Sequence, residues 1–333
     1  MAAGVDIFLK QQLVERRGRL GRALSAGTSE LQVERLIREV DAALARMDAG
    51  TFGLCEVCHE PIETERLISD PLARFCLDHL TPQQQRALES DLELAAKIQG
   101  GLLPVSHLHH RGWEAAYHYE PARIVSGDYC DLVPSSSGDL YFVLGDVAGK
   151  GVAASMLMAH LQAMFRSLIP MGLALAELVE RASRIFCQST LPTHYATLVC
   201  GKAGPSGELE ICNAGHPPPL LISGGRVDEI APTGLPLGAF CDEQFATSRV
   251  RIEPGHAILL YTDGLSEARD AGGRMYGSDR IRELALTQKG APPKEMIGNC
   301  LKDLAAFRRE VPAGDDLTIM AIRREAVPPD RSH

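Results

Sequence analysis

Four short acidic motifs in the C-terminal two-thirds of the chain contain the residues best suited to chemistry. They are Ser126-Gly127-Asp128, Gly145-Asp146-Val147, Thr262-Asp263-Gly264 and Gly314-Asp315-Asp316. Two of the motifs end apolar, strand-like segments and another precedes the last such segment, so we expect the carboxylates to meet at one rim of a sheet. Carboxylate oxygens suit Mg²⁺ or Mn²⁺, and two such ions can neutralise a phosphoryl group. Nucleases, cyclases and phosphatases all use such sites, so these residues alone leave the reaction open.

A second cluster, closer to the N-terminus, combines three cysteines and a histidine. Cys55 and Cys58 form one pair, and Cys76 and His79 form another after seventeen intervening residues. This spacing predicts a structural zinc site, in which four nitrogen or sulfur ligands close a tetrahedron. His59 is an alternative fourth ligand, although the C-x-x-H spacing favours His79.

The remaining six cysteines are scattered singly along the chain, which argues against a disulfide framework. We interpret them as unreactive thiols. They are Cys130, Cys187, Cys200, Cys212, Cys241 and Cys300.

Length and composition exclude several classes of protein. The 333 residues predict about two domains, and 45% hydrophobic with 23% charged residues is ordinary for a globular protein. A net charge of −9, from 34 basic and 43 acidic residues, disfavours a protein that wraps nucleic acid. Neither a targeting signal nor a run of 18 apolar residues is visible, so we expect a reduced, soluble, cytoplasmic protein.

Apolar periodicity predicts the elements that position these residues. Helical spacing indicates helices at 6–24, 30–48, 82–103, 152–168, 174–190 and 279–309. Strands are expected at 139–147, 195–202, 207–213, 219–223, 257–262 and 317–323. Gly100 and Gly101 are expected to interrupt the third helix and to form a hinge. Hairpin strands mixed with segregated helices predict an α+β sandwich and not a parallel βαβ sheet.

Residues 95–324 resemble the SpoIIE/RsbU-type serine phosphatases of the bacterial PPM (metal-dependent protein phosphatase) superfamily. The resemblance rests on PARIVSGDYCD, LGDVAGKGVAASMLM, CNAGHPPPLL, ILLYTDGLSEARD and DDLTIMAIR. It implies a β-sandwich flanked by helices in α-β-β-α layers, with two Mn²⁺ or Mg²⁺ ions. The implied reaction is hydrolysis of phosphoserine or phosphothreonine without a covalent intermediate. The implied substrate is a phosphorylated regulatory protein, a STAS-type anti-sigma factor antagonist in bacterial partner-switching signalling.

The same resemblance assigns roles to individual residues. Asp146, with the Val147 carbonyl, matches the ligand that bridges both ions, and Asp263 and Asp315 match further metal ligands. Asp128 matches an acidic residue that lies outside the direct ligands or on a water ligand. These four aspartates are the expected catalytic residues.

Four neighbouring residues have roles that the sequence leaves open. Asp316 is an additional candidate beside Asp315, and Glu267 is either an acidic group near a weaker third ion or a charge at the start of a helix. Lys150 is expected either to touch the substrate phosphate or to be a solvated charge. His216 is expected to stabilise the conformation of its loop through hydrogen bonds to the backbone, in preference to acting as a proton donor.

Residues 33–80 resemble the zinc-finger region of the DksA/TraR family through GTFGLCEVC, ERLISDPLAR and CLDH. This resemblance implies one structural Zn²⁺ in a regulatory or interaction module, and members of that family bind RNA polymerase. An alternative function therefore stays open, in which the chain is a DksA-like RNA polymerase-binding regulator with a non-catalytic phosphatase-fold scaffold.

The expected organisation has five parts. The chain begins with a helical segment (1–50) and a zinc finger (51–80). A coupling helix that could form a homodimer seam (81–104) then leads into a phosphatase domain (105–325) and a tail (326–333). The expected partners are a phosphorylated protein and a second copy of the chain, and RNA polymerase stays open. No contact with a membrane or with nucleic acid is expected.

Overall fold

The computed structural model of the chain describes residues 3–25, 30–80, 82–191 and 193–325. It divides into two compact units, Met1–Asp91 and Leu92–His333. The tail expected at 326–333 lies outside the described residues.

The N-terminal unit consists of two helices and a turn-rich segment. Helices α1 (Ala3–Ser25) and α2 (Glu30–Asp48) pack through a small core that includes Leu13, Val40 and Ala43. The segment that follows contains α3 (Thr64–Ser69) and the short η1 (Leu77–His79). A second small core gathers around its cysteines: Leu9, Cys55, Ile62, Leu67, Ala73 and Cys76.

Helix α4 (Pro82–Leu102) runs without a break through Gly100 and Gly101, so the predicted interruption is wrong. A glycine costs about 1 kcal/mol in a helix interior, and Gly100 and Gly101 lie in the last turn of α4, where this cost is smaller. The neighbouring side chain of Gln99 is buried and hydrogen-bonded to the backbone of Ser126, and this tertiary contact offsets the cost.

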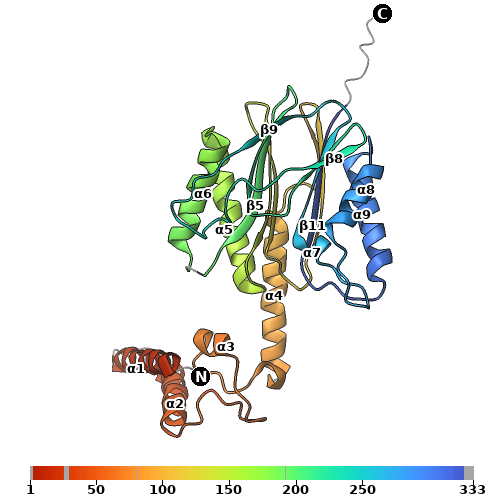
Figure 1. Cartoon of the computed structure of the whole chain (residues 1–333). Helices are drawn as coiled ribbons and strands as arrows, with labels where there is room; N and C mark the ends of the chain where they lie inside the picture. Colours follow the sequence, from red (N-terminus) through yellow and green to blue (C-terminus); the bar gives the residue numbers. More distant parts are fainter. Residues whose placement is uncertain (1–2, 26–29, 81, 192, 326–333) are drawn as a thin grey trace, which may run out of the picture. The chain divides into compact units, whose positions relative to one another are not determined.

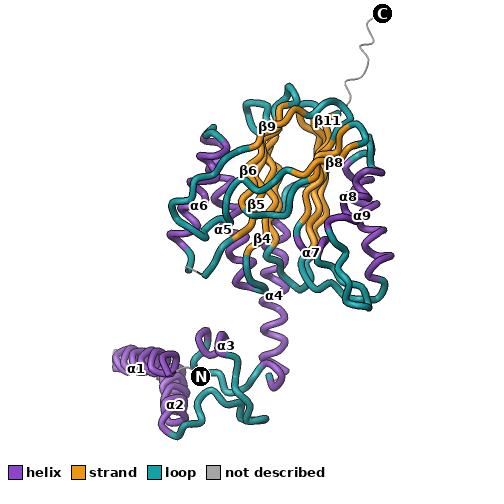
Figure 2. Tube along the Cα trace, viewed as in Figure 1, coloured by secondary structure: helices purple, strands orange, loops and turns teal. Residues whose placement is uncertain are grey.

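The C-terminal unit has four layers (Figures 1 and 2). A five-stranded sheet, in the order β3-β4-β5-β6-β9, faces a six-stranded sheet, in the order β1-β2-β11-β10-β7-β8. Helices α5 and α6 cover the first sheet, and α8 and α9 cover the second (Figure 1). This arrangement confirms the predicted α-β-β-α fold class.

The strands are β1 (His107–His110), β2 (Trp113–Glu120), β3 (Asp128–Pro134), β4 (Leu140–Val147), β5 (Ala196–Ala203), β6 (Glu208–Ala214), β7 (Leu220–Ser223), β8 (Arg226–Glu229), β9 (Ser248–Arg251), β10 (Ala257–Tyr261) and β11 (Leu317–Arg324). The helices are α5 (Val152–Leu168), η2 (Ile169–Met171), α6 (Leu175–Ser189), α7 (Asp263–Ser266), α8 (Ser278–Thr287) and α9 (Pro293–Arg308).

Alternation along the central strands builds the core, because successive side chains of a strand point to opposite faces. In β4, Phe142 and Leu144 pack between the two sheets, whereas Tyr141 and Val143 pack with the helices. The stretch Val152–Met171 is long and apolar enough to cross a membrane by length and composition. Its buried side chains, which include Met158 and Phe165, pack in this core, and that position explains its apolar character.

Several strands were not predicted, and one predicted helix is two. The first half of β2 is buried on both faces, so it lacks the alternation that reveals a half-buried strand. Strands β1, β3, β8 and β9 were also missed. The helical region at 279–309 divides into α8 and α9 because Gly290, Pro292 and Pro293 end one helix and begin the next.

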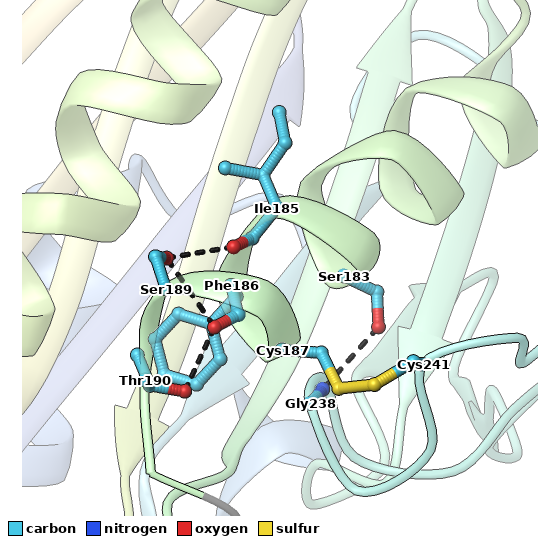
Figure 3. Close-up of a disulfide and its surroundings, with 8 residues drawn as sticks. All are labelled: Ser183, Ile185, Phe186, Cys187, Ser189, Thr190, Gly238 and Cys241. Carbon is cyan, nitrogen blue, oxygen red and sulfur yellow. Dashed lines mark hydrogen bonds between the residues drawn. A yellow bond between two sulfur atoms is a disulfide. The ribbon is translucent and has the colours of Figure 1, made fainter.

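Cys187 near the end of α6 and Cys241 in the loop before β9 form a disulfide (Figure 3). The prediction that both are unreactive single thiols is therefore wrong. They lie 54 residues apart in the sequence, and their spacing alone gives no sign that the fold brings their Cα atoms to 5.5 Å. The same loop contacts α6 again, where the Gly238 N–H donates to Ser183 Oγ at 3.2 Å (Figure 3).

Candidate functional site

The four acidic motifs converge at one end of the two facing sheets. Asp128 begins β3 and lies opposite Asp146 in the β3–β4 register. Asp263 directly follows Thr262 after β10 as the first residue of α7, and Asp315 lies just before β11. Because β10 and β11 are neighbours in the six-stranded sheet, the site takes residues from both sheets.

Asp128 connects the two sheets through two threonines that sequence reasoning did not single out. The hydroxyls of Thr262 and Thr318 donate to Asp128 Oδ2 at 3.0 and 2.5 Å. Burial, followed by the charge of Asp146, raises the pKa of Asp128 well above its usual value. Thr262 belongs to the motif T-D-G and Thr318 to the motif D-D-L-T. Each threonine lies one or two residues from an aspartate of the site, and this proximity in the sequence could have identified both.

Negative charge is concentrated around Asp146. Burial, with the charges of Asp263 and Asp315, raises the pKa of Asp146 to about 7. Burial also raises the pKa of Asp263, with contributions from Asp315 and Glu267. In the part of the chain that the structure describes, no three of these carboxylates offer oxygens within 4.8 Å of one another. Carboxylate oxygens are the hard donors that Mg²⁺ and Mn²⁺ prefer, so the residues of this rim fit divalent cations of this kind.

Asp316 and Lys150 have partners that the sequence did not reveal. Asp316 accepts hydrogen bonds from the backbone N–H groups of Ala122 and Gly127, at 2.7 and 2.8 Å, through its two oxygens. Lys150 Nζ lies 2.8 Å from Asp315 Oδ2, and this contact raises the pKa of Lys150. The lysine is therefore paired with an acidic residue of the rim.

Gly264 in the T-D-G motif is required by a close backbone approach. A Cβ atom at this position would lie 1.8 Å from the carbonyl oxygen of Asp316. The glycine thus allows the start of α7 to lie directly against the turn that carries Asp315 and Asp316.

His216 is buried and neutral. Burial lowers the pKa of His216 to about 3. Its Nδ1 lies 2.9 Å from Thr197 Oγ1, and its backbone N–H donates to Asn213 Oδ1 at 2.9 Å. These contacts fit the expected loop-shaping role.

The cysteine cluster in the N-terminal unit is also assembled. Cys55, Cys58, Cys76 and His79 each offer a ligand atom within 4.8 Å of the others. The Sγ atoms of Cys58 and Cys76 are 3.8 Å apart, which matches the edge of a tetrahedron with Zn–S bonds of about 2.3 Å. Burial raises the pKa of Cys55, but hydrogen bonds from backbone N–H groups outweigh this effect and lower it to about 6. The donor set and its spacing fit a zinc ion.

Comparison with known families places both parts of the chain. The protein-family model of Stage II sporulation protein E (SpoIIE) matches residues 136–325. The chain belongs to the SpoIIE family. The model of the prokaryotic dksA/traR C4-type zinc finger matches residues 50–78 of this SpoIIE-family chain, which confirms the second resemblance. In this chain a histidine, His79, joins three cysteines in the finger.

Curated relatives of this SpoIIE-family chain include phosphatases. It is 24% identical over 244 residues to the phosphoserine phosphatase RsbU of Bacillus subtilis, with 72% of each chain covered. It is 27% identical over 263 residues to protein IcfG of Synechocystis, covering 70% of this chain and 41% of IcfG. The chain therefore spans less than half the length of IcfG. The phosphoserine phosphatase RsbU agrees with the enzyme class expected from the sequence.

Solved structures support the same fold. The RsbU and RsbW domains of Rv1364c from Mycobacterium tuberculosis are 30% identical, with a TM-score of 0.58 over 68% of this chain and 64% of that one. The SiaA-PP2C domain of Pseudomonas aeruginosa has a TM-score of 0.64 at 21% identity, over 72% of this chain and 98% of that domain. The PP2C-type sandwich of the SpoIIE domain is thus shared with characterised structures.

Proposed function

We propose that the chain is a metal-dependent serine/threonine phosphatase that acts on a phosphorylated regulatory protein. The observation that carries this proposal is the convergence of carboxylates from both sheets, where burial and neighbouring charges raise the pKa of Asp146 to about 7. Such crowding is costly without a cation, and it suits two Mn²⁺ or Mg²⁺ ions. Membership of the SpoIIE family and the phosphoserine phosphatases among the relatives support the same reaction.

Four residues would hold the ions: Asp146, the Val147 carbonyl, Asp263 and Asp315. When bound, the ions would activate water for in-line attack on phosphorus and neutralise the phosphoryl oxygens. Lys150 already orients Asp315, and it would remain close to the incoming phosphate. Glu267 is close enough to Asp263 to raise the pKa of that residue, so it belongs to the same electrostatic site.

The other acidic residues have positioning roles in this proposal. Asp128 is held by Thr262 and Thr318 and would orient groups around Asp146 without binding an ion directly. Asp316 uses both oxygens to hold the backbone at Ala122 and Gly127, so we assign it to the framework of the site.

The surroundings of the rim suit a protein substrate. A cavity of about 280 Å³ opens beside Asp315 and is also lined by Glu267, Arg269 and Arg308. The two guanidinium groups give it positive charge next to the acidic rim, which suits an anionic segment of a phosphoprotein. RsbU-like relatives lead us to propose a STAS-type anti-sigma factor antagonist as the substrate, in a cytoplasmic partner-switching pathway.

The N-terminal unit would serve regulation. We propose that Cys55, Cys58, Cys76 and His79 hold one structural Zn²⁺ in a module that binds a regulator or a partner protein. Helix α4 exposes Leu88, Leu94 and Ile98 along its length, and these apolar side chains would form a homodimer seam with a second copy of the chain.

The rates of phosphate release from a protein substrate and from a small phosphoester test the proposal directly. Purified full-length protein with Mn²⁺ is given a serine-phosphorylated STAS-type protein and, separately, para-nitrophenyl phosphate. Faster release of phosphate from the phosphoprotein supports the proposal, and equal rates indicate an unselective phosphatase. Absence of release from both substrates favours the alternative, a DksA-like RNA polymerase ligand with a non-catalytic scaffold.

A further inference from the structure

A third cluster of potential metal ligands lies at the edge of the six-stranded sheet, on residues that the phosphatase site does not use. His107 and His109 lie on β1, Glu114 lies on β2, and each offers a ligand atom within 4.8 Å of the other two. We propose that these three residues bind a transition-metal ion of the zinc type.

Strand geometry brings the three side chains together. His107 and His109 are two residues apart on one strand, so they point to the same face. The register of β1 and β2 places His109 directly opposite Glu114, and side chains so paired lie about 5 Å apart at Cβ. The two imidazole rings are 4.9 Å apart between centroids.

The carboxylate of this cluster is buried and already oriented. Glu114 exposes only 8% of its side chain, and its Oε1 lies 3.0 Å from His107 Nε2. Arg323 on β11 donates to the other oxygen, Oε2, at 2.7 Å. A ligand carboxylate held by an outer partner is a common feature of protein metal sites. A buried acidic residue with one oxygen beside two imidazoles therefore differs from an exposed acidic cluster.

A second carboxylate lies next to the cluster. Glu325, just beyond β11, has its Oε1 2.7 Å from His109 Nδ1. Its backbone N–H donates to the carbonyl of Gly112, in the turn between β1 and β2, at 2.9 Å. Carboxylates commonly orient metal-ligating histidines in this way.

The donor set selects the class of ion. Imidazole nitrogen favours Zn²⁺, Ni²⁺ or Cu²⁺ over Mg²⁺ and Mn²⁺. Two histidines with one carboxylate and a water in the fourth position is a known zinc arrangement.

This site is separate from the acidic rim. Glu120, at the other end of β2, pairs with Leu317 at the start of β11, close to Asp315 and Asp316. Glu120 lies six positions further along the strand than Glu114, which is about 20 Å at a rise of about 3.3 Å per residue. An ion bound by this cluster would connect β1 to β2. It would also be linked to the end of β11, because Arg323 contacts Glu114 and Glu325 contacts His109.

Zinc stoichiometry tests the proposal. Full-length wild-type protein, His109→Ala and His107→Gln are saturated with Zn²⁺ in excess Mg²⁺, and tightly bound zinc is counted by competition with a chromogenic chelator. His118→Ala is the matched control, because His118 lies on the adjacent strand with its Nε2 3.1 Å from the single carboxylate of Glu120. Circular dichroism of each variant verifies folding. The variant Cys76→Ser removes one ligand of the zinc finger, so the zinc that it loses relative to the wild type is the ion held by the finger.

We expect each β1 variant to bind one zinc ion fewer than the wild type, or to bind that ion at least about tenfold more weakly. We expect His118→Ala to match the wild type. This difference does not depend on how many ions the finger or the rim retains. Equal zinc content and affinity in the wild type and in both folded β1 variants would overturn the proposal and identify the cluster as an ion-pair network.

Discussion

Gln99 and Ser126 are joined by two hydrogen bonds that close a ring between a side-chain amide and a peptide backbone. Gln99 Nε2 donates to the Ser126 carbonyl at 2.7 Å, and the Ser126 N–H donates to Gln99 Oε1 at 3.0 Å. Gln99 is only 6% exposed. Since Ser126 is two residues from Asp128, the last turns of α4 fix the backbone that carries the acidic rim.

Replacing this glutamine should therefore impair catalysis from a distance. Gln99→Ala leaves two buried backbone groups of Ser126 without partners, which costs about 1–3 kcal/mol each. We expect kcat to fall about 10- to 100-fold with a smaller change in KM. Gln85→Ala is the matched control, because Gln85 lies exposed on the same helix. A kcat in Gln99→Ala equal to that of the control would show that the contact does not position the site.

Gly264 should be intolerant of even one added methyl group. Gly264→Ala places a Cβ 1.8 Å from the Asp316 carbonyl oxygen, so the backbone of α7 or of the Asp315–Asp316 turn must move. We expect a loss of about 1–3 kcal/mol in the free energy of unfolding and a clear loss of phosphatase activity. Gly298→Ala in α9 meets no atom within 4 Å and should be neutral or stabilising. Urea denaturation of both variants measures the difference, and equal stabilities would contradict the crowding argument.

Cation affinity should depend on pH through Asp146. The folded protein raises the pKa of Asp146 to about 7 from an ordinary value of 3.8. In metal-free protein the contribution of this group to stability is thus fully present below about pH 4 and is lost as the pH rises through about 7. Mn²⁺ competes with that proton, so its affinity should rise by up to about tenfold per pH unit below about pH 7 and then level off. Calorimetric titration with Mn²⁺ between about pH 5.5 and 8 measures this profile, and a flat profile in that range would argue against Asp146 as a ligand.

The sequence predicted the acidic rim because its signals are local. An aspartate beside a glycine at a strand end can be recognised from a few consecutive residues, as Asp146 and Asp263 show. The zinc finger is equally local, since two short ligand pairs lie within 25 residues from Cys55 to His79. Helix α5 was predicted at its observed bounds because its apolar residues repeat at helical spacing.

Contacts between distant segments could not be predicted in this way. Thr262 and Thr318 reach Asp128 across 134 and 190 residues, and only the pairing of the two sheets brings them together. The Cys187–Cys241 disulfide and the β1 histidine cluster depend on tertiary position for the same reason. Helix α4 continues through two glycines because Gln99 is anchored in the fold, an effect that helix propensity does not include.

Asp263→Asn tests the central claim most directly, because this residue lies on the acidic rim at the end of β10. The measurement is the rate of phosphate release from a serine-phosphorylated protein at saturating Mn²⁺, for the wild type and this variant. Asp279→Asn on the exposed first turn of α8 serves as the control. We predict that the activity of Asp263→Asn falls at least about 100-fold and that Asp279→Asn retains wild-type activity. Only Asp263→Asn removes a carboxylate from the acidic rim. Equal activity of Asp263→Asn and the wild type would contradict the assignment of this site.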